Sequence, residues 1–129
     1  MFRILALLAI SVGVVSAQDD ATYQAWMKAT PGQVTAIRNA IMAGDNAKVK
    51  MEADKLADMF QQVADFWQKR MKEDAVKMAQ ATRDAAKEVA AATTAETQTA
   101  GVTKIQGTCG GCHRVYREGP QGGPYKIKE

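Results

Sequence analysis

Apolar side chains recur at helical spacing along most of the chain. Between residues 49 and 67 they alternate in steps of four and three, which places them on one face of a helix. These positions are Val49, Ala53, Leu56, Phe60, Val63 and Trp67. A second series with smaller side chains consists of Ala75, Met78, Thr82, Ala85, Val89 and Ala92. Small residues on that face indicate either close approach of a neighbouring helix or room for a bulky bound group.

Turn and capping signals separate these helices from their neighbours. Residues 44–46 read Gly-Asp-Asn and mark the entry to the first series. Residues 69–74 form a charged corner without Pro or Gly, so the boundary between the two series stays open. Residues 93–96 fit a capping box, with Thr93 as the N-cap and Glu96 reaching back. This box predicts a last helix that carries Val102, Ile105, Cys109, Cys112, His113 and Tyr116 on one side.

The segment before residue 44 is less regular. Its apolar positions are Tyr23, Trp26, Met27, Val34, Ile37, Ile41 and Met42. Residues 30–33 read Thr-Pro-Gly-Gln and resemble a fresh helix start, so either one helix bends there or two short helices meet. With short connections throughout, the pattern predicts an all-α fold, an antiparallel four-helix bundle at residues 18–117. The glycine- and proline-rich residues 118–129 are expected to form an exposed C-terminal extension.

The N-terminus has the pattern of a cleavable export signal. One Arg precedes an apolar run at residues 4–15, and small residues end the segment at Ala17. These features predict a signal peptide at residues 1–17, removed before Gln18. The alternative is an uncleaved anchor, but the run is shorter than the roughly 20 residues that cross a bilayer. We therefore expect a periplasmic protein without a stable membrane anchor.

Length and charge limit the classes of function. The chain of 129 residues has a formal net charge of +3, of which the signal segment supplies part. The charge is too small and too dispersed to indicate nucleic-acid binding, which needs a clustered basic face. The mature chain is long enough for one small domain.

The sequence Cys109-Gly110-Gly111-Cys112-His113 uses both cysteines and the only histidine of the chain. C-x-x-C-H is the attachment pattern of c-type haem. The two thiols add to the two haem vinyl groups, and the histidine that follows can give its neutral imidazole to the iron as proximal ligand. The motif therefore predicts one covalently bound haem c.

Three other readings of the two cysteines remain open. A structural zinc site needs four ligands, usually as two pairs, and no second pair exists. A thioredoxin-like motif would lie beside a βαβ pattern, of which there is no sign. A simple disulfide between Cys109 and Cys112 is possible, but it leaves His113 without a role.

An exported helical chain with this motif near its C-terminus resembles the class II c-type cytochromes, the cytochrome c′ and cytochrome c-556 family. The family pattern C-x-x-C-H-x-x-Y-R is matched by Cys109, Cys112, His113, Tyr116 and Arg117. The Met-Lys pair early in the family's first helix is matched by residues 27–28. The resemblance covers residues 23–117. It implies a haem wedged between the helices, with its iron facing the first helix.

The resemblance makes the sixth iron position the functional question. In c-556-like members a methionine of the first helix binds there and the protein transfers electrons. In cytochrome c′ members the iron is five-coordinate and binds NO or CO. Met27 occupies the matching position, although it can also be a core residue, since methionine often fills gaps in packing. We expect a low-spin His113/Met27 haem that transfers electrons. A peroxidase-type enzyme would need a distal acid or base, and no second histidine exists, so we expect no enzymatic activity.

A few further residues are placed only by their position. Arg117 can pair with a haem propionate or be a solvated arginine. Four aromatic residues can line the haem or belong to the core: Trp26, Phe60, Phe66 and Trp67. Lys126 and Lys128 can dock an acidic redox partner or simply be solvated. The expected partners are periplasmic redox proteins, and the resemblance makes a homodimer possible.

Overall fold

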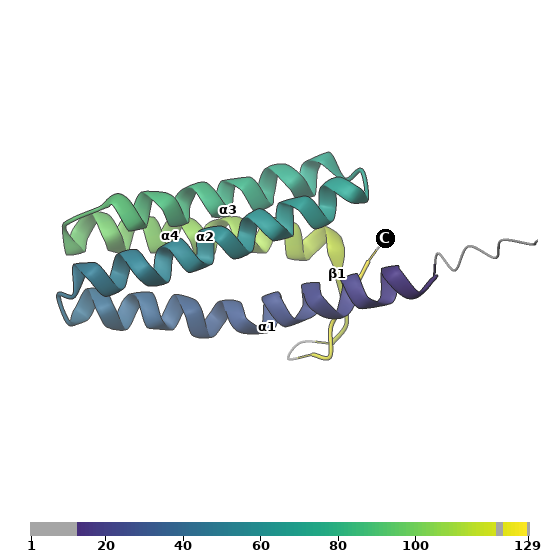
Figure 1. Cartoon of the computed structure of the whole chain (residues 1–129), viewed down its shortest axis with the longest axis horizontal. Helices are drawn as coiled ribbons and strands as arrows, with labels where there is room; N and C mark the ends of the chain where they lie inside the picture. Colours follow the sequence, from purple (N-terminus) through teal and green to yellow (C-terminus); the bar gives the residue numbers. More distant parts are fainter. Residues whose placement is uncertain (1–12, 121–122, 129) are drawn as a thin grey trace, which may run out of the picture.

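The computed structural model describes residues 13–120 and 123–128. Four helices make up most of this part of the chain, and Figure 1 shows them lying side by side along the long axis of the molecule. They are α1 (Gly13–Met42), α2 (Asn46–Lys69), α3 (Glu73–Ala91) and α4 (Ala95–Tyr116). The expectation of an all-helical chain with four helices is confirmed.

The predicted export signal falls mostly outside the described residues. Residues 1–12 lie outside them, and residues 13–17 form the beginning of α1. Within the described part, no helix combines the length and the apolar character that crossing a bilayer requires.

The turn between α1 and α2 follows from two residues. Gly44 has a φ of +68°, which favours glycine, and its N–H donates to the Ile41 carbonyl at 3.0 Å. The next N–H, that of Asp45, donates to the Ala40 carbonyl, which completes a Schellman motif. The Asp45 carboxylate then caps α2 by accepting from the Lys48 N–H at 3.0 Å. The predicted start of this helix is confirmed.

The corner between α2 and α3 uses the same geometry without glycine. Met71 has a φ of 56°, and the N–H of Lys72 donates to the Trp67 carbonyl at 3.2 Å. This left-handed conformation is usually taken by glycine, and a methionine in it is strained. Because no glycine stands here, the sequence carries no signal for the boundary.

The cap before α4 lies one residue later than predicted, and Thr97 takes the place predicted for Glu96, because its hydroxyl donates to the Thr94 carbonyl at 3.0 Å. The N-cap is Thr94 and not Thr93, because the Thr94 hydroxyl accepts from the Thr97 N–H at 3.2 Å. Two adjacent threonines offer the same chemistry, and tertiary packing selects between them. The Thr93 carbonyl instead accepts from the Asn46 side chain at 3.2 Å.

One continuous helix, α1, passes through the predicted interruption. Pro31 lies inside it and has no N–H to donate to the Met27 carbonyl. Threonine hydroxyls on both sides bond to backbone carbonyls, Thr30 to Trp26 at 2.9 Å and Thr35 to Pro31 at 3.0 Å. The helix therefore loses one hydrogen bond at Pro31 without ending there.

The small face of α3 has two uses along its length. Near one end, a Cβ added at Gly101 of α4 would lie 2.5 Å from a Val89 methyl group, so the two helices touch there. Farther along, Ala79 and Thr82 line a cavity. Thr82 also contacts α4, since its hydroxyl lies 2.6 Å from the Thr108 hydroxyl, so this face of α3 both packs closely against α4 and borders the cavity.

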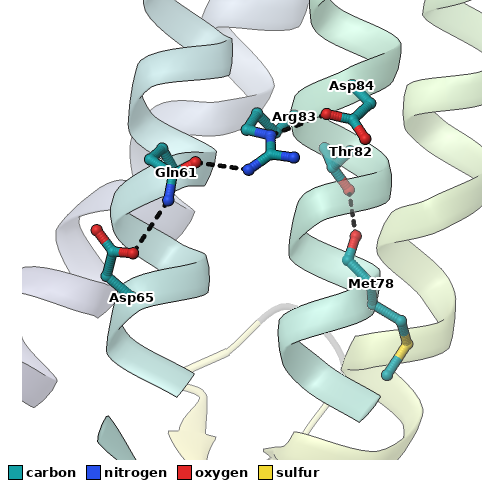
Figure 2. A network of polar contacts seen from close by, with 6 residues as sticks. All are labelled: Gln61, Asp65, Met78, Thr82, Arg83 and Asp84. Atoms are coloured by element: carbon teal, nitrogen blue, oxygen red, sulfur yellow. Dashed lines mark hydrogen bonds and ion pairs between the residues drawn. The ribbon is translucent and has the colours of Figure 1, made fainter. Parts of the chain in front are cut away.

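A polar network on the other side of α3 ties it to α2. Figure 2 shows Arg83 reaching Gln61, with Nη1 donating to Oε1 at 2.6 Å. Gln61 Nε2 donates to Asp65 at 3.0 Å, and Arg83 Nε donates to Asp84 at 2.8 Å. Thr82 contacts α4 instead, where its hydroxyl lies against the Thr108 hydroxyl.

The C-terminal segment folds back on the bundle. Strands β1 (Arg117–Glu118) and β2 (Lys126–Ile127) form an antiparallel pair, and Ile127 is half-buried against the core. Glu118 and Lys126 are exposed as expected, so within the strand pair the expectation of an exposed extension is wrong only at Ile127. Its apolar contact with the bundle joins residues too far apart in sequence to produce a periodic pattern.

Candidate functional site

The Cys109–His113 segment lies near the C-terminal end of α4 and lines a cavity. Cys112 and His113 follow Cys109 by three and four positions, so all three lie on one side of the helix. All three are half-buried and line a cavity of about 610 Å³. Ligand and cofactor pockets typically have roughly 300–1,000 Å³.

Helices α1, α2 and α3 supply the apolar walls of this cavity. The wall residues are Met27, Val34, Phe60, Val63, Met78 and Ala79. Met27 is half-buried and packs against the core. The structure thus brings Met27 to the same cavity as Cys109, Cys112 and His113, although they lie at opposite ends of the sequence.

Burial shifts the pKa values of the motif side chains. It lowers the pKa of His113, and the nearby positive charge of Arg117 lowers it further. Imidazole is therefore held in its neutral, ligating form at neutral pH. Burial also raises the pKa of Cys109, and it raises that of Cys112 to about 11, with Asp74 adding to the effect. In the unliganded site both cysteines are therefore held as thiols at neutral pH.

The rim of the cavity carries positive charge. Among the described residues that line it, the charged ones are all basic: Lys28, Arg38, Arg117 and Lys126. Arg38 donates to the Gln106 side-chain oxygen at 2.6 Å. Arg117 places its guanidinium 3.9 Å from the centre of the Tyr125 ring. Such a rim suits a ligand with carboxylates at its edge.

A cluster of four aromatic rings closes one end of the cavity. Tyr23 stacks on Phe66 with ring centres 4.5 Å apart, and Trp67 lies 4.6 Å from Tyr116. Tyr23 and Tyr116 line the cavity, while Phe66 and Trp67 are buried behind them. The Tyr116 hydroxyl donates to Asp74 Oδ1 at 2.5 Å, which ties α4 to the beginning of α3.

These residues fit a covalently attached haem. The cavity is large and mostly apolar, two thiols and one neutral imidazole share its α4 wall, and its rim is basic. The two cysteines are free thiols and are spaced for two thioether bonds. Cys109 and Cys112 would hold the porphyrin, and His113 would bind the iron.

The residues named from the sequence divide into two groups. Lining the cavity are Met27, Phe60, Cys109, Cys112, His113, Arg117 and Lys126. Trp26 packs against the core, and Phe66 and Trp67 belong to the buried core itself. For these three aromatic residues the core reading holds.

Sequence reasoning missed several residues of the site. The sequence pattern places Tyr23 on an apolar helix face and leaves the face of Met78 open to close packing or to a bound group, and both residues line the cavity. Lys126, expected to dock an acidic partner or to be solvated, lines it as well. The spacing of apolar residues shows which side of a helix is buried but not which of those residues border a cavity, because that depends on how the neighbouring helices pack.

Within the described residues, no three or more His, Cys, Asp and Glu side chains gather in a group that could hold a metal ion by themselves. Searches against known protein families, characterised proteins and solved structures each gave no significant match to this chain.

Proposed function

We propose that this chain is an exported monohaem c-type cytochrome of class II that transfers electrons in the periplasm and is not an enzyme. The observation that carries the proposal is the single cavity lined by Cys109, Cys112, His113 and Met27. The three-residue connections between helices support an antiparallel order of the bundle.

Each of these four side chains has a separate role in the proposal. Cys109 and Cys112 form thioethers that keep the cofactor attached. His113 gives its imidazole to one side of the iron, and Met27 gives its thioether to the other. The bound haem supplies a one-electron couple between ferrous and ferric iron.

Electron transfer is favoured over gas binding by the position of Met27. Its side chain is half-buried at the cavity wall formed by α1. A thioether there suits haem iron and raises its potential. A five-coordinate haem that binds NO or CO requires that Met27 stay away from the iron.

The absence of a second histidine in the sequence argues against peroxidase-type chemistry. His113 is the one histidine of the chain and is assigned to the iron. The cavity then holds no histidine to transfer protons to a bound peroxide. An electron carrier needs no such group, and its partners would be periplasmic redox proteins.

The intact mass of the protein purified from periplasm tests attachment and export together. We expect the mass of residues 18–129 plus one haem, and we expect the haem to stay bound through acid–acetone extraction. Replacing both Cys109 and Cys112 with Ala should remove the covalent haem. Gly107→Ala is the matched control on the same helix, because a Cβ there meets nothing within 4 Å.

Two outcomes would contradict the proposal. A wild-type protein that folds with a Cys109–Cys112 disulfide or with bound zinc is no cytochrome. A chain that begins at Met1 and is recovered in the membrane fraction has an anchor in place of a cleaved signal.

A further inference from the structure

The antiparallel pair of β1 and β2 forms a C-terminal hairpin. This hairpin is held against the end of α4 that carries His113. In the strand pair, Arg117 lies opposite Ile127 and Glu118 opposite Lys126. The Lys128 N–H donates to the Tyr116 carbonyl at 2.8 Å, and Ile127 packs against the core. Backbone and apolar contacts together hold the tail in this place.

The turn of the hairpin depends on glycine. Gly119 has a φ of +136°, and a Cβ there would lie 2.5 Å from the Pro124 carbonyl oxygen. This close approach brings the returning chain back to β1. On the same hairpin the Tyr125 ring stacks against the Arg117 guanidinium, which restrains that side chain.

Each strand of the hairpin contributes one cation to the cavity lining. Arg117 lies on β1 and Lys126 on β2, and both line the cavity. Of the other rim cations, Arg38 is hydrogen-bonded to Gln106, and Lys28 lies on α1. The described lining residues include no carboxylate; Glu118, which lies opposite Lys126 in the strand pair, is not among them.

We propose that the C-terminal hairpin is a haem-binding element in which Lys126, together with Arg117, pairs with the propionate carboxylates. This inference rests on the haem proposed above. Two cations that line an apolar cavity, one from each strand of the hairpin, match a ligand with an apolar body and acidic groups at its edge. The tail thereby becomes part of the site, and Ile127 holds it in place.

The titration of the haem propionates in the intact holoprotein tests this pairing. It is followed by NMR of the haem signals and by the midpoint potential as a function of pH. In Lys126→Gln, loss of a nearby cation should raise the propionate pKa by about 1 unit. Lys126→Arg, which keeps the charge, should titrate like the wild type.

Two matched variants make the test specific. Lys128→Gln makes the same charge change two residues away, at a side chain that is not among the cavity-lining residues, and should leave the titration unchanged. Arg38→Gln removes a cavity-lining cation that belongs to α1 and not to the hairpin, and should have a smaller effect than Lys126→Gln.

Three results would overturn the inference. A Lys126→Gln titration that matches that of Lys128→Gln would show that the hairpin does not touch the carboxylates. A shift seen with Arg38→Gln alone would place the carboxylates beside α1. Absence of covalent haem from the wild-type mass would remove the proposed function as well, so the two failures are distinguishable.

Discussion

At the scale of single residues, Met27 governs the coordination of the proposed haem. It lines the cavity from α1, whereas Cys109, Cys112 and His113 line it from α4. A second methionine, Met78, lines the cavity from α3, and its Sδ would lie 3.2 Å from a Cβ at Gly111. The two thioethers therefore belong to different walls.

Replacing Met27 with Ala should open the sixth coordination position. We expect the wild-type ferric protein to be low-spin and to bind CO slowly, because the thioether must leave first. The variant should be high-spin, bind CO faster and have a lower midpoint potential, since a ligand that favours ferrous iron is gone. Absorption spectra and stopped-flow CO binding measure these changes.

Met78→Leu is the matched control for that experiment. It removes a thioether from the same cavity while conserving volume, so it should cost less than about 1.5 kcal/mol and keep the spectrum. Met42 is 79% exposed and should likewise tolerate Leu. A wild-type protein that is already high-spin and binds CO at once would show that Met27 does not bind the iron, and it would favour the gas-binding function.

At the scale of helices, α4 forms although it contains four glycines. Two of them, Gly101 and Gly107, differ in their surroundings. Gly101 faces Val89 of α3 at a distance that leaves no room for a side chain. Gly107 is exposed, and a Cβ there would meet nothing within 4 Å. The same residue type therefore serves packing at one position and only lowers helix propensity at the other.

Substituting alanine at these two glycines should have opposite effects on stability. Gly101→Ala should lower the free energy of unfolding by about 1–3 kcal/mol, because the new methyl group overpacks the contact with Val89. Gly107→Ala should raise it by about 0.5–1 kcal/mol, because alanine has the higher helix propensity. Urea unfolding of both variants measures the difference. Equal effects would mean that α3 and α4 are not in close contact at Gly101.

Helix boundaries show how far local signals extend. Gly44 and Asp45 predicted the start of α2, because both the Schellman turn and the cap are made by neighbouring residues. Thr93 was predicted as the cap of α4 and Thr94 took that place. Pro31 left two possibilities, and α1 is continuous because a single lost hydrogen bond does not end a helix whose other bonds persist.

At the scale of the whole molecule, one hydrogen bond links the C-terminal end of α4 to the beginning of α3. The Tyr116 hydroxyl donates to Asp74 at 2.5 Å. This bond raises the pKa of Tyr116 to about 12 and lowers the pKa of Asp74. It should therefore make the stability of the fold depend on pH at both extremes.

The sign of this dependence follows from the two pKa shifts. Above pH about 10 the unfolded chain loses the Tyr116 proton while the folded protein keeps it, so stability falls as pH rises toward 12. In acid, stability falls as pH drops below the ordinary range of a carboxyl and through the lowered pKa of Asp74. Near neutral pH the contribution is complete.

Tyr116→Phe should remove this contribution. The variant should be less stable than the wild type at pH 7, and the difference should shrink toward pH 12 and toward strong acid. Urea unfolding across this pH range measures it, with Tyr125→Phe as the same change at a tyrosine away from Asp74. A difference that is constant with pH would mean that the bond to Asp74 does not contribute to stability.

The sequence alone determined the chemistry of the motif and most of the helical architecture. Cys109, Cys112 and His113 are close in sequence, so helical geometry places them on one face whatever surrounds them. The amphipathic series that became α2 and α3 likewise depend on spacing within one segment. Such features are local, and for that reason they can be read from the chain.

Only the tertiary structure decided which other residues share the site. Tyr23, Met78 and Lys126 come from three different parts of the chain and meet at one cavity. Their arrangement depends on which sides of α1, α3 and α4 border the cavity and on the return of the tail over the bundle. These contacts join residues distant in sequence, and their free energy comes from burial that no periodic pattern records.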